Sequence, residues 1–513
     1  MHFWEIIAVG ELTWGALFVF AVITAMTLLM NLTKMKTEAV FLLGVVALFL
    51  SGVINEESAF GGFSSESVLI TATLFIVVGG LTYTGVINWI VKNLLGKPKT
   101  FKRAIARLMF PVALLSSLIG DTTVVAMFIN VVRIWSKKLN LTPSKLLIPL
   151  SYAACIGGAC TLIGTPTNLL VASFYTESTG KTLSIFTPTI CGLVCLMVCV
   201  LSTIALRKLL PTRKSPMEGI DSDDFTAELT VPSDSLMIGN GLDETGYFDN
   251  GDLRVVAIRR FDDEIVTPVE PDEFIMGGDR MIVTGKTEAI LNFCRKEHLG
   301  NEHIEGILLS EGDIENKGKS TIISTLIILV MVLLSAFSIV PLMKSCVIAA
   351  VAMIFFKCCT PRQAMNSIEW DVLIIFACSV CIGKALTATG VTNILADKLI
   401  AYNGGSPYIA LFILCLVATI VTEFLSDTAT AAVLTPVALD IATTMHANPL
   451  TFCVAIMIAS AANFATPIGA HAHMHVFVPG GYKFSDFVKI GIPMNIIILI
   501  TNMVITCLVF PIV

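Results

Sequence analysis

Two acidic segments of the chain share one pattern, and their aspartates lie 306 positions apart. Residues 120–129 read GDTTVVAMFI and residues 426–435 read SDTATAAVLT, so Asp121 and Asp427 each precede a threonine in an apolar stretch. A carboxylate in apolar surroundings is costly unless it is paired, protonated or bound to a cation. The chemistry that this pattern predicts is therefore the binding of small ions.

Each acidic segment is followed by a segment rich in glycine, proline and threonine. The first reads GTPTN over residues 164–168, and the second reads TPIGAHAH over residues 466–473. Gly469 follows Gly164 by 305 positions, so both halves keep the same spacing. Glycine and proline interrupt helices. Matching interrupted segments in two halves of an apolar chain are typical of secondary transporters built from inverted repeats.

The predicted substrate and ion site lies where the interrupted segments meet. Its residues are Gly120, Asp121, Thr122, Thr123, Gly164, Thr165, Pro166, Thr167, Asn168, Ser426, Asp427, Thr428, Thr466, Pro467, Gly469, His471 and His473. Asp121 and Asp427 could hold a sodium ion, and no other cofactor is expected. The threonine hydroxyls could contact a ligand or bond back to helix carbonyls, and those beside the aspartates are the better candidates.

Three histidines at alternate positions, His471, His473 and His475, allow two interpretations. Three such side chains meet at a metal ion only if the segment is extended, because residues i and i+2 of a helix point apart. In the other interpretation only His473 faces the site, while the other two pack or face its wet rim. The second is favoured, since short motifs often match by chance.

The composition places the chain in a membrane. Hydrophobic residues make up 55% of the sequence and charged residues 14%, and the mean hydropathy is +0.83. This profile differs from that of a soluble domain, and a net charge of −6 gives no reason to expect nucleic-acid binding. No nucleophile–base pair or phosphate-binding loop is recognisable, so an enzyme is not expected. The predicted location is the lipid bilayer of a bacterial inner membrane.

The apolar runs predict a polytopic α-helical membrane protein. Expected spans are 14–31, 38–54, 67–86, 148–174 and 186–208 in the first half, and 320–338, 343–357, 371–389, 450–478 and 486–511 in the second. Between the third and fourth spans of each half, residues 104–136 and 406–444 are interrupted at the acidic motif. These two stretches are expected to form re-entrant hairpins, because irregular backbone at membrane depth is tolerated only inside protein or along a wet cavity.

The chain divides into three predicted units. Residues 1–211 form the first membrane repeat, residues 318–513 form the second repeat with inverted orientation, and residues 212–317 form a small cytosolic α+β domain with strand-like runs. Basic residues gather on one side of the predicted spans, which is therefore the cytoplasmic side. Both termini are then expected outside.

The motifs also resemble a known family. The two acidic motifs, GTPTNLLV at 164–171 and ATPIGAHAHMHVFVPGGYKFSDFVKIGIP at 465–493 resemble the divalent anion:sodium symporter family of the ion transporter superfamily, in particular its sulfate-transporter-like branch. Residues 252–285, DLRVVAIRRFDDEIVTPVEPDEFIMGGDRMIVTG, look like part of a TrkA-C (RCK C-terminal) domain. The first resemblance covers essentially all of the membrane part.

The resemblance implies an elevator-type homodimer with a moving transport domain. In the family, a Ser-Asn-Thr motif in each hairpin holds sodium and touches the carboxylates or sulfate oxygens of the substrate. This chain has Asp121 and Asp427 where the family has asparagine, and His473 in the position opposite Asn168. The resemblance also implies that the insert binds an unknown small ligand.

Two functions follow from the site as the sequence gives it. The first is secondary active transport of a small anion, namely sulfate, another inorganic oxyanion or a dicarboxylate, coupled to sodium or protons. Protons are possible because Asp121, Asp427 and His473 can all titrate in a buried site. The alternative is transport of a cation, or cation/proton exchange, with the acidic residues as the substrate site. A channel belongs to the same second class, because the acidic site would favour it too. A sensor is a third class, and the intact glycine and proline interruptions in both halves argue against it.

Overall fold

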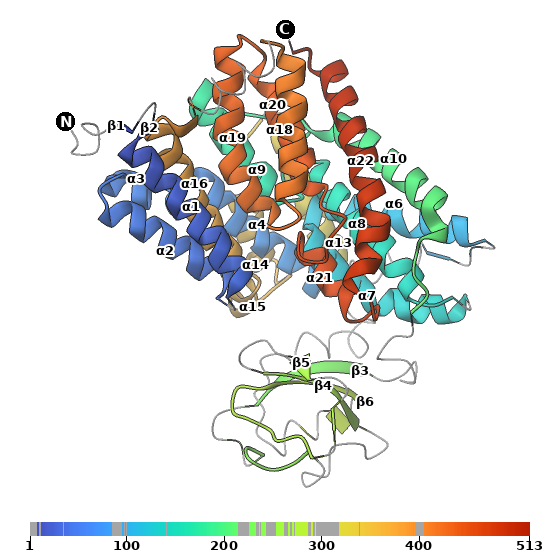
Figure 1. Cartoon of the computed structure of the whole chain (residues 1–513). Helices are drawn as coiled ribbons and strands as arrows, with labels where there is room; N and C mark the ends of the chain where they lie inside the picture. The colour runs from blue at the N-terminus through green and yellow to red at the C-terminus, as the bar shows by residue number, and fades with distance from the viewer. Residues whose placement is uncertain are drawn as a thin grey trace.

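The protein is described here by a computed structural model. It describes residues 12–33, 35–84, 100–139, 141–213, 318–337, 339–392 and 405–512, parts of 225–293, and a few shorter stretches. The expected boundary regions of the insert, 214–224 and 294–317, lie outside the described residues. Figure 1 shows a body of helices and, outside it, a small sheet.

The first half of the helical body begins with a short hairpin of two strands, β1 (Ala8–Val9) and β2 (Leu12–Thr13). Its helices are α1 (Trp14–Leu32), α2 (Thr37–Leu50), α3 (Glu56–Gly61), α4 (Glu66–Tyr83), α6 (Phe101–Ile119), α7 (Asp121–Lys138), α8 (Ser144–Ala159), α9 (Pro166–Thr179) and α10 (Thr189–Ala205), followed by the 3-10 turn η2 (Leu206–Lys208).

The second half repeats this order of helices. They are α13 (Gly318–Ala336), α14 (Leu342–Phe355), α15 (Pro361–Asn366), α16 (Trp370–Ala388), α18 (Pro407–Val421), α19 (Asp427–Thr444), α20 (Pro449–Ala461), α21 (His471–Phe477) and α22 (Phe484–Val509). Each expected span therefore contains helix, and the predicted spans 148–174 and 450–478 are each divided into two helices by a non-helical stretch.

Local backbone chemistry explains where the interrupted helices begin. Gly120 has a φ of +105°, a conformation that costs glycine little, and α7 starts at the next residue. Ser426 caps α19 by accepting a hydrogen bond from the amide of Ala429 at 3.3 Å. Thr165 caps α9, which begins with Pro166. The motifs that the sequence singles out are therefore helix starts.

Length and composition identify helices that can cross a bilayer. Among the described residues, four helical stretches are long and apolar enough, namely Glu56–Tyr83, Thr189–Lys208, Trp370–Ala388 and Phe484–Val509. Shorter apolar helices accompany them in both halves. The packing unites the halves, because one large hydrophobic core contains residues of α4, α6 to α10, α13 to α16 and α18 to α22. A smaller core joins α1, α2 and α3 to one face of α16 and to α19.

The insert contains an antiparallel sheet with the strand order β3-β6-β4-β5. Its strands are β3 (Phe225–Thr230), β4 (Leu253–Arg259), β5 (Ile265–Val266) and β6 (Arg280–Gly285). The sheet has its own buried apolar cluster, which includes Leu229, Val255 and Met281. The strand-like runs predicted at 253–258 and 280–283 are confirmed.

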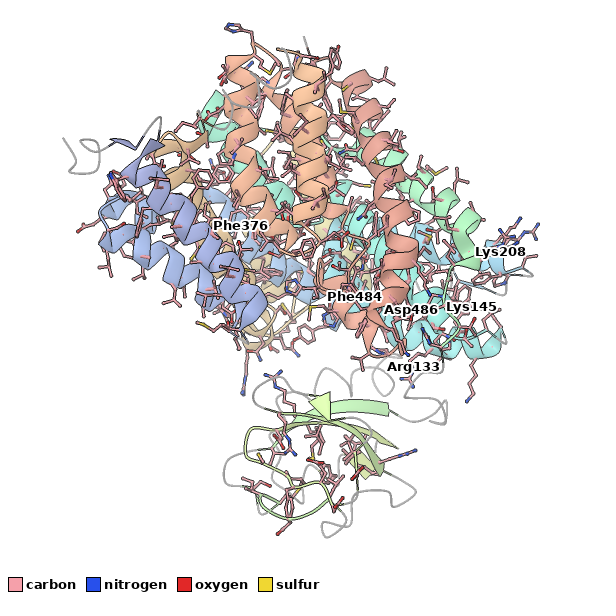
Figure 2. The ribbon with its side chains drawn as sticks, viewed as in Figure 1. Arg133, Lys145, Lys208, Phe376, Phe484 and Asp486 are labelled. Atoms are coloured by element: carbon pink, nitrogen blue, oxygen red, sulfur yellow. The ribbon has the colours of Figure 1, made fainter. Side chains whose placement is uncertain are left out.

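One described residue at the edge of the insert is tied to the helical body. Arg213 donates from Nε and Nη2 to the two carboxylate oxygens of Asp486, both at 2.9 Å. Its backbone amide also donates to the Ser144 hydroxyl at 3.0 Å. Ser144 begins α8 and Asp486 lies in the first turn of α22, so Arg213 connects the start of the insert to both helices. Asp486, Arg133 and Lys145 lie on the side of the body nearest the sheet (Figure 2).

Candidate functional site

A cavity of about 650 Å³, including the space at its mouth, lies where the interrupted helices meet. It is lined by Phe75, Ile119, Gly120, Asp121, Thr122, Thr123, Thr165, Pro166, Glu369, Val372, Ile375, Ser426, Asp427, Thr428, Ala470 and His471. The four helices that follow the predicted motifs, α7, α9, α19 and α21, begin at this cavity, and α16 also begins beside it with Glu369. A helix start carries free amides and about half a positive charge, so the arrangement attracts anions.

The two acidic residues have the same local geometry. The Oδ1 atom of Asp121 accepts hydrogen bonds from the amide and hydroxyl of Thr122, at 2.7 and 3.3 Å. The Oδ1 atom of Asp427 accepts the same two bonds from Thr428, at 2.8 and 3.4 Å. Each carboxylate therefore uses one oxygen to accept hydrogen bonds from the threonine that follows it, which leaves the other oxygen for a ligand.

Equivalent hydrogen bonds also brace the two loops behind the cavity. The hydroxyl of Thr161 donates to the carbonyl of Ser117 at 2.5 Å and accepts from the amide of Gly164 at 3.1 Å. In the second half, Thr466 donates to the carbonyl of Glu423 at 2.7 Å and accepts from the amide of Gly469 at 3.1 Å. The partners lie 305 or 306 positions apart, as the acidic motifs do.

Seven of the predicted site residues belong to the same motifs but do not line the cavity. They are Gly164, Thr167, Asn168, Thr466, Pro467, Gly469 and His473. Asn168 is fully buried and donates to the carbonyls of Ala159 and Thr161, at 3.2 and 2.7 Å. Thr167 and Thr428 share a hydrogen bond of 3.1 Å between their hydroxyls. These contacts join the first interrupted segment to the second acidic motif.

Of the two predicted site histidines, His471 lines the cavity and His473 does not, which differs from the interpretation in which only His473 faces the site. Residues 471–477 form the helix α21, and its first residue, His471, lines the cavity. His473 is buried among the rings of Tyr152, Phe464 and Phe487, with centroid distances of 5.5, 6.3 and 5.6 Å.

The helical segment also answers the question of a three-histidine metal site. Residues i and i+2 of a helix point apart, and His471 and His475 are exposed while His473 is buried. Among the described residues, no group of three or more histidine, cysteine, aspartate or glutamate side chains is arranged to hold a metal ion. The sodium expected at Asp121 and Asp427 would need oxygens from hydroxyls, carbonyls or substrate as well.

Glu369 lines the cavity although it belongs to none of the predicted motifs. It precedes α16 and lies close enough to Asp121 and His471 for their charges to interact. The signal available in the sequence was an acidic residue at the start of an apolar span, which normally indicates a helix cap. With Glu369, the cavity contains three carboxylates and one histidine.

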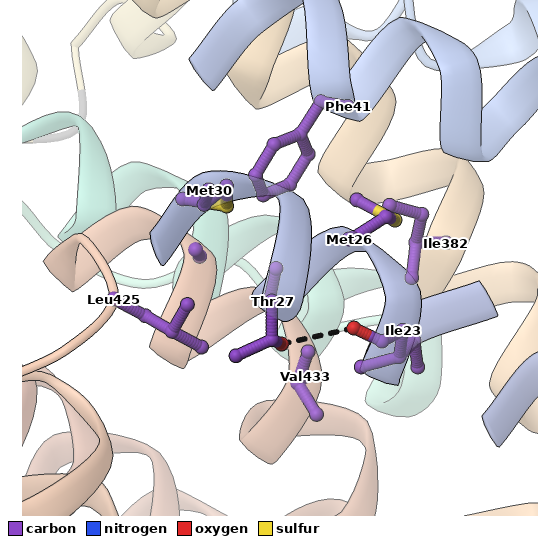
Figure 3. Close-up of a pocket in the computed structure, with 10 residues that line it drawn as sticks. Ile23, Met26, Thr27, Met30, Phe41, Ile382, Leu425 and Val433 are labelled. Atoms are coloured by element: carbon purple, nitrogen blue, oxygen red, sulfur yellow. Dashed lines mark hydrogen bonds between the residues drawn. The ribbon is translucent and has the colours of Figure 1, made fainter. Parts of the chain in front are cut away.

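A second cavity has a different character. It lies between α1, α2, α16 and α19 and is lined by Ile23, Met26, Thr27, Met30, Phe41, Ile382, Leu425, Ala429, Ala432 and Val433 (Figure 3). Its only polar side chain, Thr27, donates to the carbonyl of Ile23 at 2.9 Å. An apolar cavity whose one hydroxyl is satisfied has little to offer an ionic ligand.

Known proteins with similar sequences include several transporters. Residues 18–400 match the family model described as "Citrate transporter", and residues 309–513 match "Sodium:sulfate symporter transmembrane region". An uncharacterized transporter of Synechocystis is 25% identical, with 96% of each chain covered. Sodium/sulfate cotransporter 1 of Chlamydomonas reinhardtii is 29% identical over 51% of this chain and 29% of its own.

A solved structure has a similar fold. The crystal structure of the YdaH transporter of Alcanivorax borkumensis aligns with a TM-score of 0.50 at 11% identity, covering 96% of this chain and 98% of that one. The chain is thus an integral membrane protein and a secondary transporter of anions rather than an enzyme. Because the citrate transporter model covers well over half of it, the chain belongs to that family, and the two family matches together support the divalent anion:sodium symporters as its wider group.

Proposed function

We propose that this chain carries a small anion, either sulfate or another inorganic oxyanion, or a dicarboxylate, together with sodium ions or protons. The observation that carries the proposal is the cavity into which four helix starts and the acidic pair Asp121 and Asp427 converge. The names of the matching families and relatives support the substrate class.

The charge of the cavity explains why cations should accompany the anion. Four helix starts supply roughly two positive charges in total, while Asp121, Asp427 and Glu369 supply up to three negative charges when ionised. A dianion entering this cavity would be repelled unless sodium ions or protons neutralised the carboxylates. Coupling to a cation is therefore a property of the binding site itself.

Both coupling ions fit the same side chains. A sodium ion would use the free oxygens of Asp121 and Asp427, with hydroxyls such as those of Thr122 and Thr428 nearby. A proton would bind to the carboxylates directly. The family resemblance favours sodium, whereas the replacement of two amides by carboxylates favours protons.

The remaining features of the proposal come from the family resemblance and the internal repeat. Residues 1–211 and 318–513 would be inverted repeats that contain two re-entrant hairpins, in an elevator-type homodimer. Residues 212–317 would form a cytoplasmic TrkA-C-like domain that binds a small ligand, and both termini would lie outside. The equivalent hydrogen bonds of Thr161 and Thr466 support the repeat.

An alternative function is cation transport, or cation/proton exchange. The three carboxylates of the cavity favour it, since they would suit a cationic substrate. The four helix starts oppose it, because they place positive potential at the same point. The two functions differ in which ion accumulates.

Uptake by proteoliposomes tests the proposal. Purified protein would be reconstituted, and uptake of sulfate, dicarboxylates and divalent cations would be measured with imposed sodium or proton gradients. We expect sulfate or a dicarboxylate to accumulate above its equilibrium level under one of these gradients. Accumulation of a divalent cation alone would instead support the alternative function.

A further inference from the structure

Glu369 lies at the cavity on a helix outside the interrupted motifs. As the residue before α16 it makes no capping hydrogen bond, and its carboxylate has no ion pair within the described part of the chain. It is half-buried beside Asp121 and His471. A carboxylate that is partly desolvated and supports no local structure is costly, which points to a role toward a ligand.

The counterpart of Glu369 in the first half is Ser65. Helices α4 and α16 begin 304 positions apart, and Ser65 and Glu369 are their N-caps. The cavity meets the two helices differently. From α16 it includes Glu369 and residues of the first two turns, whereas α4 contributes only Phe75 from its middle and Ser65 is not part of the lining.

We propose that Glu369 and Ser65 alternate at the transport site. In the state described here, Glu369 faces the ligand; in the opposite access state, Ser65 takes its place. The reason is that in a protein built from inverted repeats the opposite state arises when the halves exchange their arrangement around the site. A site that contacts the start of α16 and the middle of α4 would then contact the start of α4 and the middle of α16. This inference rests on the proposed function.

The exchange would give the two states different charges. A carboxylate faces the anion on the side of the membrane where α16 begins, which is the cytoplasmic side under the proposed topology, and a neutral hydroxyl faces it on the other. One unit charge at about 10 Å and an effective dielectric constant of about 20 changes an affinity by about tenfold or more. Glu369 therefore weakens anion binding and strengthens cation binding on one side only, which favours release of the anion there.

The first test compares apparent KM values for sulfate from the two sides of proteoliposomes with oriented protein. We expect Glu369→Gln to lower the KM by about tenfold on the side where α16 begins and to leave it unchanged on the other side. Glu57→Gln is the matched control, because Glu57 is an exposed acid of α3 that does not line the cavity. It should change neither value.

The reciprocal variant makes the test sharper. Ser65→Glu should raise the KM for sulfate on the opposite side by a similar factor, because it adds a carboxylate to the state that lacks one. Equal changes on both sides for Glu369→Gln, or no change on either, would overturn the proposal.

A cross-linking test needs no substrate, so it separates this inference from the proposed function. Two cysteine pairs are equivalent in the repeat: Glu369→Cys with Ala470→Cys, and Ser65→Cys with Thr165→Cys. If both access states are visited, a short bis-maleimide should link both pairs, as detected by mass spectrometry of the linked peptides, while each single variant gives none. Linking of the first pair without the second would overturn the proposal even if sulfate is transported.

Discussion

Equivalent residues of the two halves make the same hydrogen bonds at the cavity. Asp121 and Asp427 each accept from the amide of the following threonine with one oxygen and leave the other for a ligand. The sequence could predict this pair because the motif and its spacing recur. It could not predict which histidine faces the cavity, since that depends on where the helix α21 begins. Nor could it predict that Glu369, which precedes a helix distant in the chain, lines the same cavity.

The two histidines should respond differently to replacement. We expect His471→Gln to change uptake and its dependence on the cation without lowering thermal stability, because His471 is exposed to the cavity. His473→Ala should instead lower the stability by on the order of 2–4 kcal/mol, because it leaves a void among three buried rings.

Thermal unfolding in detergent and uptake by proteoliposomes, measured on both variants, distinguish the two roles. A destabilised His471→Gln and a stable His473→Ala protein would contradict the assignment.

The loops between the interrupted helices pass very close to neighbouring backbone. A Cβ atom at Gly164 would lie 2.5 Å from the carbonyl oxygen of Gly158 and 2.9 Å from that of Ser116. At Gly469 it would lie 2.8 Å from the carbonyl oxygen of Thr422. The sequence predicts glycine-broken helices at both places, and the helix bounds confirm the breaks. The close contacts between segments are a tertiary property that no local pattern contains.

Gly164→Ala should therefore disturb the cavity without changing any residue that lines it. We expect a loss of about 1–3 kcal/mol in stability, because backbone atoms would have to move apart, and a large loss of uptake. Gly61→Ala is the matched control, because its new Cβ would have only the Lys384 amine as a neighbour, at 3.8 Å. Wild-type uptake by a stable Gly164→Ala protein would show that the tight loop is not needed.

At the scale of the whole molecule, the described contacts join the insert to the body at Arg213. The sequence predicts a separate strand-rich unit, and the described strands of this region form a sheet with a buried apolar cluster of its own. It gave no indication of the bond to Asp486, because the partners lie 273 positions apart. Since Asp486 lies in the first turn of α22 and Ser144 begins α8, a movement at the start of the insert would displace contacts with two helices of the large core.

The Arg213–Asp486 pair can be tested by exchange of its charges. Asp486 is almost fully buried, so Asp486→Asn should cost about 1–3 kcal/mol of stability by weakening two charge-assisted hydrogen bonds. The double variant Arg213→Asp with Asp486→Arg should recover part of that loss relative to either single variant. The melting temperatures of these variants in detergent measure the contribution of the pair to stability. Equal melting temperatures for Asp486→Asn and wild type would mean that the pair does not hold the insert to the helical body.

We expect the cavity at Asp121 and Asp427 to bind an anion only with accompanying cations. The most direct measurement is sulfate accumulation by proteoliposomes under an inward gradient of protons or of sodium, for wild type, Asp427→Asn and the control Asp440→Asn, whose aspartate lies on the same helix outside the cavity lining. We predict that one gradient drives accumulation by wild type and Asp440→Asn, and that Asp427→Asn keeps sulfate binding but loses its dependence on that cation. Two results would contradict this expectation. One is an Asp427→Asn protein whose sulfate uptake depends on the cation as strongly as that of the wild type. The other is accumulation of sulfate by the wild type without either gradient.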